Sequence, residues 1–288
     1  MGVRSIIKKL IPSKIKKAIK QEFGSSTLYE LNLVDLHKLD NKIAIVTGGS
    51  GAIGSAICFR LAMEGAIVGV CARSIEKAKV VIDNIQKNGG KAFPVIMDLT
   101  VDKSIQAAFV KIAEEYGEID ILVNNAGGSA RGMAKNFEEQ NFSVVDMILS
   151  TNLRGTMYCT HEALKHMKKS NSSRIINMSS IVGLQGKTGM TDYAASKSGL
   201  IGFTRSLAIE LGSCGITVNC VSPGWVSHAV FDRGMKIQEG NVNCMGHSGQ
   251  TDDVAGAVAY LVSEDAKYVT GQNIIVDGGR SLGLWGDN

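Results

Sequence analysis

A tyrosine and a lysine four residues apart, Tyr193 and Lys197, are the residues of this 288-residue chain best suited to proton transfer. Their segment favours a helix, on which residues i and i+4 share a face, so the ammonium would lie beside the phenol. A free tyrosine titrates at about 10, and a neighbouring cation stabilises its phenolate. Moving that pKa about three units towards neutrality requires about 4 kcal/mol, which a close and partly desolvated charge supplies. The pair predicts an acid/base group that works near neutral pH, although chance also places such pairs on ordinary helices.

A glycine-rich turn at residues 47–54, Thr-Gly-Gly-Ser-Gly-Ala-Ile-Gly, follows one expected strand and opens one expected helix. Small residues let the backbone approach a pyrophosphate, and a helix N-terminus offers free N–H donors and positive potential. Turns of this kind also occur without a ligand, so the prediction of a dinucleotide site depends on the surrounding strand–helix–strand unit. The residues expected to contact the cofactor here are Gly48, Ser50, Gly51 and Ile53.

The end of the second expected strand indicates which dinucleotide binds. An acidic residue there would bond the 2′-hydroxyl of the adenosine ribose and favour NAD. This chain instead has Arg73 followed by Ser74. A guanidinium pairs with a phosphate through two hydrogen bonds, and a serine adds a hydroxyl, so we expect NADP in preference to NAD. The alternative is that Arg73 is an ordinary surface arginine.

Strand-like and helix-like segments alternate from residue 42 onwards. The expected strands are residues 42–47, 66–71, 91–97, 119–124, 174–177, 216–221 and 273–276. The expected helices are residues 52–64, 75–87, 101–116, 151–169, 193–211 and 251–263. Apolar strands that alternate with helices predict an α/β fold, a doubly wound parallel sheet between two layers of helices. We expect one domain over residues 39–288 and a separate extension over residues 1–38.

Composition narrows the class of protein further. An apolar fraction of 44% is enough for a buried core, and no apolar run is long enough to span a bilayer. Six scattered cysteines without a CxxC pair predict reduced thiols in a cytoplasmic protein. We expect no metal site, since no cluster of histidines and cysteines has ligand spacing.

The net charge of +4 arises from the first 20 residues, which contain seven basic residues and no acidic one. The remainder is slightly acidic, which argues against a nucleic-acid-binding surface. In the extension, apolar residues recur at helical spacing with lysines between them, and Pro12 is expected to divide it into two short helices. Three interpretations stay open: a helix on an anionic membrane surface, an arm that docks a partner or another subunit, and a passive tail. A mitochondrial presequence is less favoured, because the segment has only one arginine.

These motifs together resemble the short-chain dehydrogenase/reductase family. The resemblance extends over about residues 40–280, with its blocks in the family's order. It implies a Rossmann fold, an NAD(P)-dependent oxidoreductase that interconverts a carbonyl and an alcohol, and a homotetramer or dimer. Besides the turn and the Tyr193–Lys197 pair, the blocks are Asn124-Asn125-Ala126-Gly127, Asn152 in Thr-Asn-Leu-Arg-Gly, Ser179-Ser180, Pro223-Gly224 and Val276-Asp277-Gly278-Gly279.

The resemblance also implies catalytic roles for individual residues. Tyr193 would protonate the carbonyl oxygen during reduction, and Lys197 would lower its pKa and bind the nicotinamide ribose. Ser180, thirteen residues before the tyrosine, would hold the substrate oxygen, and that spacing favours it over Ser179. Asn152 would position a water that links the lysine to solvent.

For the cofactor, the resemblance implies contacts beyond the turn and Arg73. Asp98 would face the adenine with Leu99 beside it, while Asn125 and Val226 would contact the cofactor through the backbone. Some residues depart from the family's pattern, which leaves phosphate discrimination mainly to Arg73. They are Ala52 in place of a glycine, Gly51 where many NADP-using members have a basic residue, and His228 where a threonine usually binds the nicotinamide amide. His228 would then weaken that clamp or contact the substrate.

Residues 225–249 correspond to the segment that covers the substrate, and they mix apolar with charged side chains. The arginines that dock an acyl carrier protein in related reductases are replaced by Asn171 and Cys214. We therefore expect a small polyol, sugar or hydroxy acid, and rank a 3-oxoacyl thioester second. A nucleotide-binding interaction protein docked by its extension is the alternative from another class, and the intact set of catalytic residues argues against it. Nothing in the sequence adds the extra acid or base that an epimerase would need.

Overall fold

The computed structural model describes residues 38–129, 131–167, 169, 172–227 and 243–282. At its centre is a sheet of seven parallel strands in the order β3-β2-β1-β4-β5-β6-β7. This confirms the predicted fold class. The strands are β1 (Ile43–Val46), β2 (Ile67–Ala72), β3 (Lys91–Ile96), β4 (Ile121–Asn124), β5 (Ser173–Met178), β6 (Ile216–Pro223) and β7 (Asn273–Val276).

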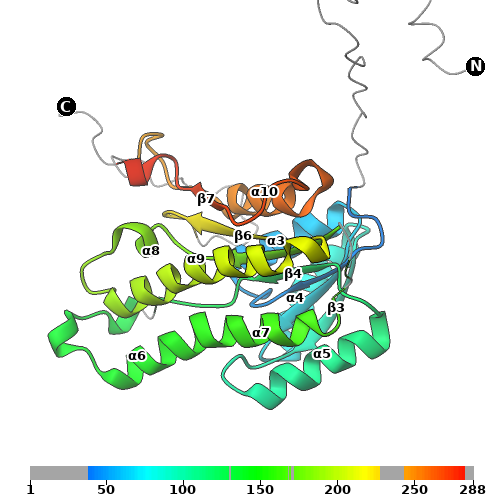
Figure 1. Ribbon diagram of the computed structural model, residues 1–288, viewed down its shortest axis with the longest axis horizontal. Helices are drawn as coiled ribbons and strands as arrows, with labels where there is room; N and C mark the ends of the chain where they lie inside the picture. The colour runs from blue at the N-terminus through cyan, green and yellow to red at the C-terminus, as the bar shows by residue number, and fades with distance from the viewer. Residues whose placement is uncertain (1–37, 130, 168, 170–171, 228–242, 283–288) are drawn as a thin grey trace, which may run out of the picture. The chain divides into compact units, whose positions relative to one another are not determined.

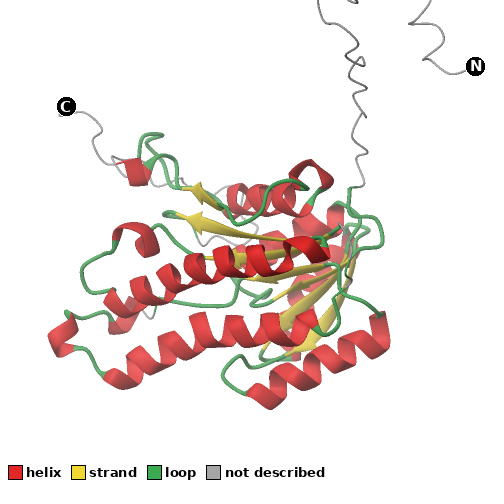
Figure 2. Ribbon diagram, viewed as in Figure 1, coloured by secondary structure: helices red, strands yellow, loops and turns green. Residues whose placement is uncertain are grey.

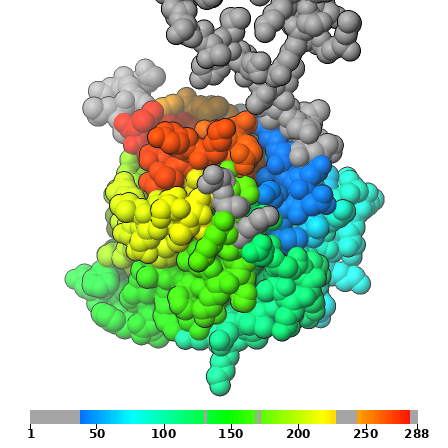
Figure 3. Space-filling model, turned by 45° about the vertical axis from the view of Figure 1, so that its right-hand side comes forward, coloured from blue at the N-terminus to red at the C-terminus, as the bar shows by residue number. Residues whose placement is uncertain are grey.

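Helices cover both faces of the sheet (Figures 1 and 2). α3, α4 and α10 supply side chains to one hydrophobic core, while α5, α7 and α9 supply the other. In the space-filling view, the surface over α9 lies between that over α10 and that over α6 and α7 (Figure 3). The helices are α3 (Ala52–Met63), α4 (Ile75–Lys87), α5 (Asp102–Tyr116), α6 (Phe142–Leu149), α7 (Gly155–Leu164), α8 (Val182–Gln185), α9 (Thr191–Leu211) and α10 (Thr251–Val262).

The strands are apolar on both sides because each side faces a layer of helices. In β1, Ala44 and Val46 belong to the core beneath α3, whereas Ile43 and Ile45 belong to the core beneath α5. Successive side chains of a strand point to opposite faces, so a strand with two covered faces reads as a continuous apolar run. This pattern is why the strands were predictable from the sequence.

The helix expected at residues 151–169 differs most from the structure. The helical run begins at Phe142 as α6, passes through a π-helical turn over Ser150–Arg154 and continues as α7 to Leu164. A π turn contains one residue more than an α turn, so the apolar periodicity changes phase there and conceals the first half of the helix. The one-turn helix α8 was also not expected.

Several sequence-based expectations concern residues outside the described part of the chain. They include the extension with its three interpretations and the positions Asn171 and His228. The domain boundary expected at residue 38 stays a prediction. Within the described part, no helix is both long and apolar enough to cross a membrane.

Candidate active site

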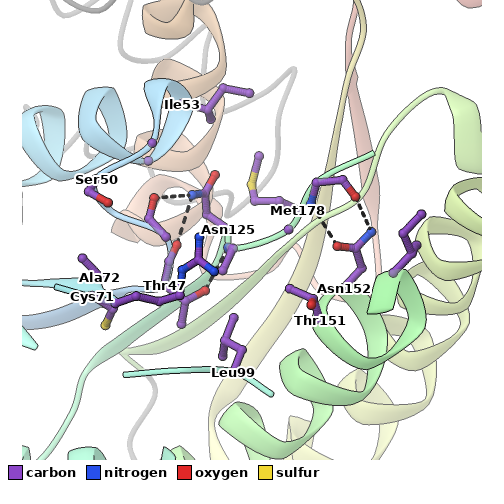
Figure 4. Close-up of a pocket in the computed structure, with 18 of the residues that line it drawn as sticks. Thr47, Ser50, Ile53, Cys71, Ala72, Leu99, Asn125, Thr151, Asn152 and Met178 are labelled. Atoms are coloured by element: carbon purple, nitrogen blue, oxygen red, sulfur yellow. Dashed lines mark hydrogen bonds between the residues drawn. The ribbon is translucent and has the colours of Figure 1, made fainter. Parts of the chain in front are cut away.

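A cavity of about 630 Å³ opens at the carboxyl ends of the central strands (Figure 4). Most of its lining residues lie at or just after the carboxyl ends of β1 to β6, and the others come from α6, the π turn and α9. The strand order reverses between β1 and β4, and ligands of open parallel sheets bind in the crevice at such a point. Figure 4 shows Ser50 and Ala72 on one side of the pocket, Asn152 and Met178 on the other, and Asn125 between them.

The glycine-rich turn forms one wall, and its backbone geometry requires glycine at two positions. Gly48 has a φ of +63°, and a Cβ on Gly54 would stand 2.2 Å from the Gly48 carbonyl oxygen. Gly51 is the N-cap residue of α3, and no side chain caps this N-terminus. Uncapped N–H groups at a helix N-terminus suit an anion, so the turn fits a pyrophosphate. The predicted residues Gly48, Ser50, Gly51 and Ile53 all line the pocket.

Asn125 connects this turn to the end of β4. Its side-chain amide donates to the carbonyl oxygens of Thr47 and Gly48, at 3.0 and 3.2 Å. The Thr47 hydroxyl in turn accepts the N–H of Ala126 at 3.0 Å. Sequence reasoning placed Asn125 at the cofactor, and the structure adds that its side chain fixes the shape of the turn.

Arg73, Asp98 and Leu99 lie together at the end of the pocket formed by β2 and β3. The Asp98 carboxylate accepts the backbone N–H of Thr100 at 2.9 Å and its hydroxyl at 2.7 Å. These bonds, with a smaller contribution from the positive charge of Arg73, hold the pKa of Asp98 below its usual value. Arg73 is exposed, so its guanidinium is accessible to a ligand phosphate.

Lys197 is buried in the opposite wall, with 4% of its surface exposed. Its ammonium donates to the carbonyl oxygen of Met178 at 2.7 Å and lies 5.8 Å from the centre of the Tyr193 ring. A Cβ on Gly127 would be 3.3 Å from the lysine Nζ, so the ammonium reaches the backbone of the Asn-Asn-Ala-Gly segment. Burial lowers the pKa of Lys197 to about 8, and the neighbouring Cys220 opposes this shift only partly.

Tyr193 lines the pocket and is held through its backbone at the start of α9. Its N–H donates to Asp192 Oδ1 at 2.7 Å, and its carbonyl oxygen accepts the Ser196 hydroxyl at 2.8 Å. The helix places Lys197 one turn later, as the spacing predicts. The tyrosine ring and the lysine ammonium therefore come together as expected.

Asn152 sits in the π turn and is 1% exposed. Its amide nitrogen donates to the Gly128 carbonyl oxygen at 3.0 Å and to the Ser196 hydroxyl at 3.1 Å, while its oxygen accepts the Gly128 N–H at 3.0 Å. One side chain thus joins the loop after β4 to the second turn of α9. π turns are frequent at functional sites, and this one contains the pocket residue Asn152.

The two serines after β5 differ in their surroundings. Ser179 lines the pocket, and its hydroxyl donates to the Lys197 carbonyl oxygen at 2.7 Å. Ser180 is not among the lining residues, and its hydroxyl accepts the N–H of Val182 at 3.2 Å. Val226 is likewise buried and away from the lining, where it pairs with Gly249. The structure therefore brings together eleven of the thirteen predicted site residues and leaves Ser180 and Val226 beside the pocket.

Sequence reasoning missed several residues of the site. Met133, Met147 and Met178 contribute hydrophobic surface to the pocket, and the first two are 51% and 42% exposed. Methionines carry no sequence signal of their own, because they occur equally in ordinary cores. Cys71 also lines the pocket, where burial raises the pKa of its thiol well above the usual value. A neutral thiol is a poor nucleophile, so the acid/base pair remains the reactive chemistry of this site.

The arrangement suits proton transfer coupled to a bound dinucleotide. A buried ammonium favours the phenolate of a neighbouring tyrosine, and a half-buried ring in a cavity is accessible to a substrate oxygen. Among the described residues, no group of three or more His, Cys, Asp or Glu side chains could hold a metal ion.

Comparison with known proteins agrees with this geometry. A family model described as enoyl-(acyl carrier protein) reductase matches residues 48–281. The chain is similar to the 3-oxoacyl-[acyl-carrier-protein] reductase FabG of Staphylococcus aureus, with 39% identity over 246 residues that cover 84% of this chain and 98% of that protein. It is 34% identical over 250 residues to the (2S)-[(R)-hydroxy(phenyl)methyl]succinyl-CoA dehydrogenase subunit BbsD of Thauera aromatica, which covers 85% and 98%.

Solved structures show the same fold. A short-chain dehydrogenase from Burkholderia cenocepacia in complex with NADP has a TM-score of 0.75 and 33% identity, covering 84% of this chain and 99% of that one. A short-chain dehydrogenase/reductase from Serratia marcescens has a TM-score of 0.77 and 36% identity, covering 85% and 100%. The chain belongs to the short-chain dehydrogenase/reductase family and is an NAD(P)-dependent oxidoreductase.

Proposed function

We propose that this protein is an NADP(H)-dependent reductase that converts a carbonyl group into a secondary alcohol. The observation that carries the proposal is the buried Lys197 ammonium, 5.8 Å from the centre of the Tyr193 ring, in the same cavity as the glycine-rich turn. Tyr193 gives a proton to the carbonyl oxygen, and Lys197 stabilises the phenolate that remains. Asn152 holds the Gly128 backbone and the Ser196 hydroxyl in place. A homo-oligomer is the assembly that we expect.

The residues of the pocket fit an NADP molecule. The turn from Gly48 to Ile53 receives the pyrophosphate, Arg73 the 2′-phosphate, and Asp98 with Leu99 the adenine. When bound, the nicotinamide supplies the hydride, and the protein supplies alignment and charge stabilisation. The complex of the Burkholderia cenocepacia relative with NADP supports this assignment.

For the substrate, we propose a 3-oxoacyl thioester. The lining contributed by α6 and the loop before it is rich in thioether and aliphatic groups, from Met133, Met147 and Ile148. Such a surface suits an acyl chain better than a polyol, whose hydroxyls need hydrogen-bond partners. Two relatives are named for thioester-linked substrates. This order reverses the ranking made from the sequence, in which a small polyol, sugar or hydroxy acid came first.

A panel of carbonyl substrates tests the proposal. Purified protein is given NADPH or NADH together with a 3-oxoacyl thioester, a small keto sugar or a 2-oxo acid, and the absorbance of the reduced nicotinamide is followed. We expect the highest kcat/KM for the thioester with NADPH. No oxidation of either cofactor with any substrate would refute the proposed reaction, and a preference for the keto sugar would restore the original ranking.

Replacing Arg73 by Ala should weaken NADPH binding by about 10- to 100-fold and leave NADH binding unchanged, because a charge-assisted bond to the 2′-phosphate is lost. Fluorescence titration of both cofactors measures the effect. Lys79→Ala, which removes the same charge from an exposed position on α4, serves as the control and should bind both cofactors as the wild type does. Equal weakening for NADPH and NADH would show that Arg73 does not read the 2′-phosphate.

The Ser180 hydroxyl lies beside the pocket and accepts the Val182 N–H, so it can still donate its own proton to a substrate oxygen. If it does, replacing Ser180 by Ala should lower kcat/KM by about 100-fold, the usual cost of losing one donor to the reacting oxygen. Ser179→Ala removes the bond to the Lys197 carbonyl oxygen and should cost about 1 kcal/mol of stability with a small effect on rate. Steady-state kinetics and denaturant unfolding of both variants distinguish the two serines. A large rate loss in Ser179→Ala alone would assign the substrate contact to Ser179.

A further inference from the structure

A buried carboxylate, Asp192, directly precedes the proposed acid/base residue. It is 5% exposed, and both of its oxygens accept hydrogen bonds. Oδ1 accepts the Tyr193 N–H at 2.7 Å, and Oδ2 accepts the side-chain amide of Gln140 at 3.0 Å. A carboxylate in the first turn of α9 is also stabilised by the helix dipole. Helix capping explains the bond to the backbone, but it does not explain a glutamine that reaches the carboxylate from a loop 52 residues earlier.

Gln140 lies at the end of the loop that precedes α6 and makes hydrogen bonds within that loop. Its amide nitrogen also donates to the Met133 carbonyl oxygen at 3.4 Å, and its oxygen accepts the Asn141 N–H at 3.0 Å. Asn141 caps α6, whose residue Met147 lines the pocket together with Met133. Gln140 therefore contacts the two segments that supply Met133 and Met147 to the pocket wall.

The loop and the start of α9 also touch elsewhere. A Cβ on Gly189 would be 3.7 Å from the Lys135 carbonyl oxygen. Figure 1 shows the loop before α6 and the turn between α8 and α9 at the same end of the sheet. On the other side of Tyr193, its carbonyl oxygen accepts the Ser196 hydroxyl, which accepts the Asn152 amide, which in turn donates to Gly128. Both ends of the segment from Gly128 to Gln140 are thus linked to the beginning of α9, Gln140 through Asp192 and Gly128 through Asn152 and Ser196.

We propose that Gln140 and Asp192 are positioning residues that couple the substrate-binding loop to Tyr193. The proposal rests on the proposed function of Tyr193 as the proton donor. The pair fixes where the tyrosine stands relative to the methionine wall that receives the substrate. A displacement of a catalytic group by about 1 Å relative to its substrate can lower the reaction rate by about 100-fold.

Gln140→Glu places a second carboxylate against Asp192. Two adjacent carboxylates repel each other when both are ionised, so they separate at pH 8, and protonation of one of them at acid pH removes the repulsion. We expect kcat/KM to fall by about 10- to 100-fold at pH 8 and to recover at acid pH. The double variant Gln140→Glu/Asp192→Asn reverses the donor and acceptor and keeps one negative charge, so it should restore activity at pH 8. The segments that pack around the Gln140–Asp192 pair also contain other titratable or charged groups. These are Tyr193 and Lys197 on α9, the exposed residues Lys135, Glu138, Glu139 and Lys187, and Asp146 on α6.

The test compares wild type, Gln140→Glu, the double variant and Gln86→Glu, which makes the same change on the exposed face of α4. The pH profiles of kcat and KM and the thermal unfolding midpoint are measured for each. A Gln140→Glu variant as active as the wild type at pH 8 would overturn the proposal, as would a double variant no better than the single one. Loss of activity that follows the unfolding midpoint in every variant would reduce the pair to a structural role and overturn it too.

A second measurement needs no turnover. The phenolate absorbance of Tyr193, obtained by subtracting the spectrum of Tyr193→Phe, is titrated in each variant. Displacing the ring from the Lys197 ammonium should move this titration to higher pH in Gln140→Glu, and the double variant should return it to the wild-type position. Identical titration curves in all variants would refute the proposed coupling, whether or not a substrate is reduced. A wild type that reduces no substrate but whose variants show shifted titrations would refute only the proposed reaction.

Discussion

Tyr193→Phe should lower kcat by about 1000-fold, because proton transfer by a positioned side chain contributes roughly 100- to 10,000-fold. Phenylalanine keeps the ring and removes only the hydroxyl. The backbone bonds from Tyr193 to Asp192 and Ser196 do not involve that hydroxyl and should persist. Cofactor binding and the unfolding midpoint should therefore stay close to the wild-type values, which separates lost chemistry from lost structure.

Single-turnover reduction, with NADPH titration and thermal unfolding in parallel, measures this effect. Tyr268→Phe is the matched control, since Tyr268 is 99% exposed and distant in sequence from the site. It should behave as the wild type. A Tyr193→Phe variant that retains more than a tenth of the activity would mean that another group protonates the substrate.

The second large effect concerns the stability of the cofactor-free protein at alkaline pH. Lys197 has a pKa of about 8 in the folded protein, against about 10.4 in an unfolded chain. Between about pH 8 and 10.4, folding therefore releases a proton from Lys197, and the unfolded chain binds more protons than the folded protein. The unfolding free energy of the protein must then rise with pH across this range. The penalty of the buried ammonium, about 3 kcal/mol, is fully present below pH 8 and is relieved as the pH approaches 10.4.

Denaturant unfolding of the wild type and of Lys197→Met at several pH values isolates this contribution. The variant lacks the titrating group, so the difference in unfolding free energy, wild type minus variant, should increase by about 3 kcal/mol between pH 8 and 10.4. Both proteins carry Tyr193→Phe, because Lys197 shifts the titration of that phenol, and groups that do not interact with Lys197 cancel in the difference. A constant difference would mean that the lysine keeps its ordinary pKa and is better solvated than its 4% exposure indicates.

The sequence predicted the fold class and most of the sheet, because strands covered on both faces leave a plain apolar pattern. The helix Ile75–Lys87 and the strand Asn273–Val276 have the bounds expected for them. The helix that begins at Phe142 was missed in its first half. The π turn interrupts the apolar periodicity of this helix. The exposed Met147 could not be assigned to the site from the sequence, because only the structure shows that it lines the cavity.

The candidate site was predictable where chemistry requires a residue type at a fixed spacing. Tyr193 and Lys197 belong to one helix turn, so their proximity follows from local geometry. Gln140 and Asp192 are 52 residues apart and have no local signature, and only the tertiary fold brings them together. The same holds for the two serines, whose spacing to the tyrosine favoured Ser180 while the structure turns Ser179 to the pocket.

The π turn at Ser150–Arg154 also has a consequence for how relatives diverge. One additional residue rotates the later part of the helix by about 100°, so an uninterrupted helical run faces two directions. Before the turn, Met147 and Ile148 face the ligand cavity, and after it, Cys159 and Ala163 fill the core against the sheet. Substitution of the exposed Met147 would alter what the enzyme accepts without disturbing the core against the sheet. Selection for a new substrate and selection for stability thus act on separate halves of one helix.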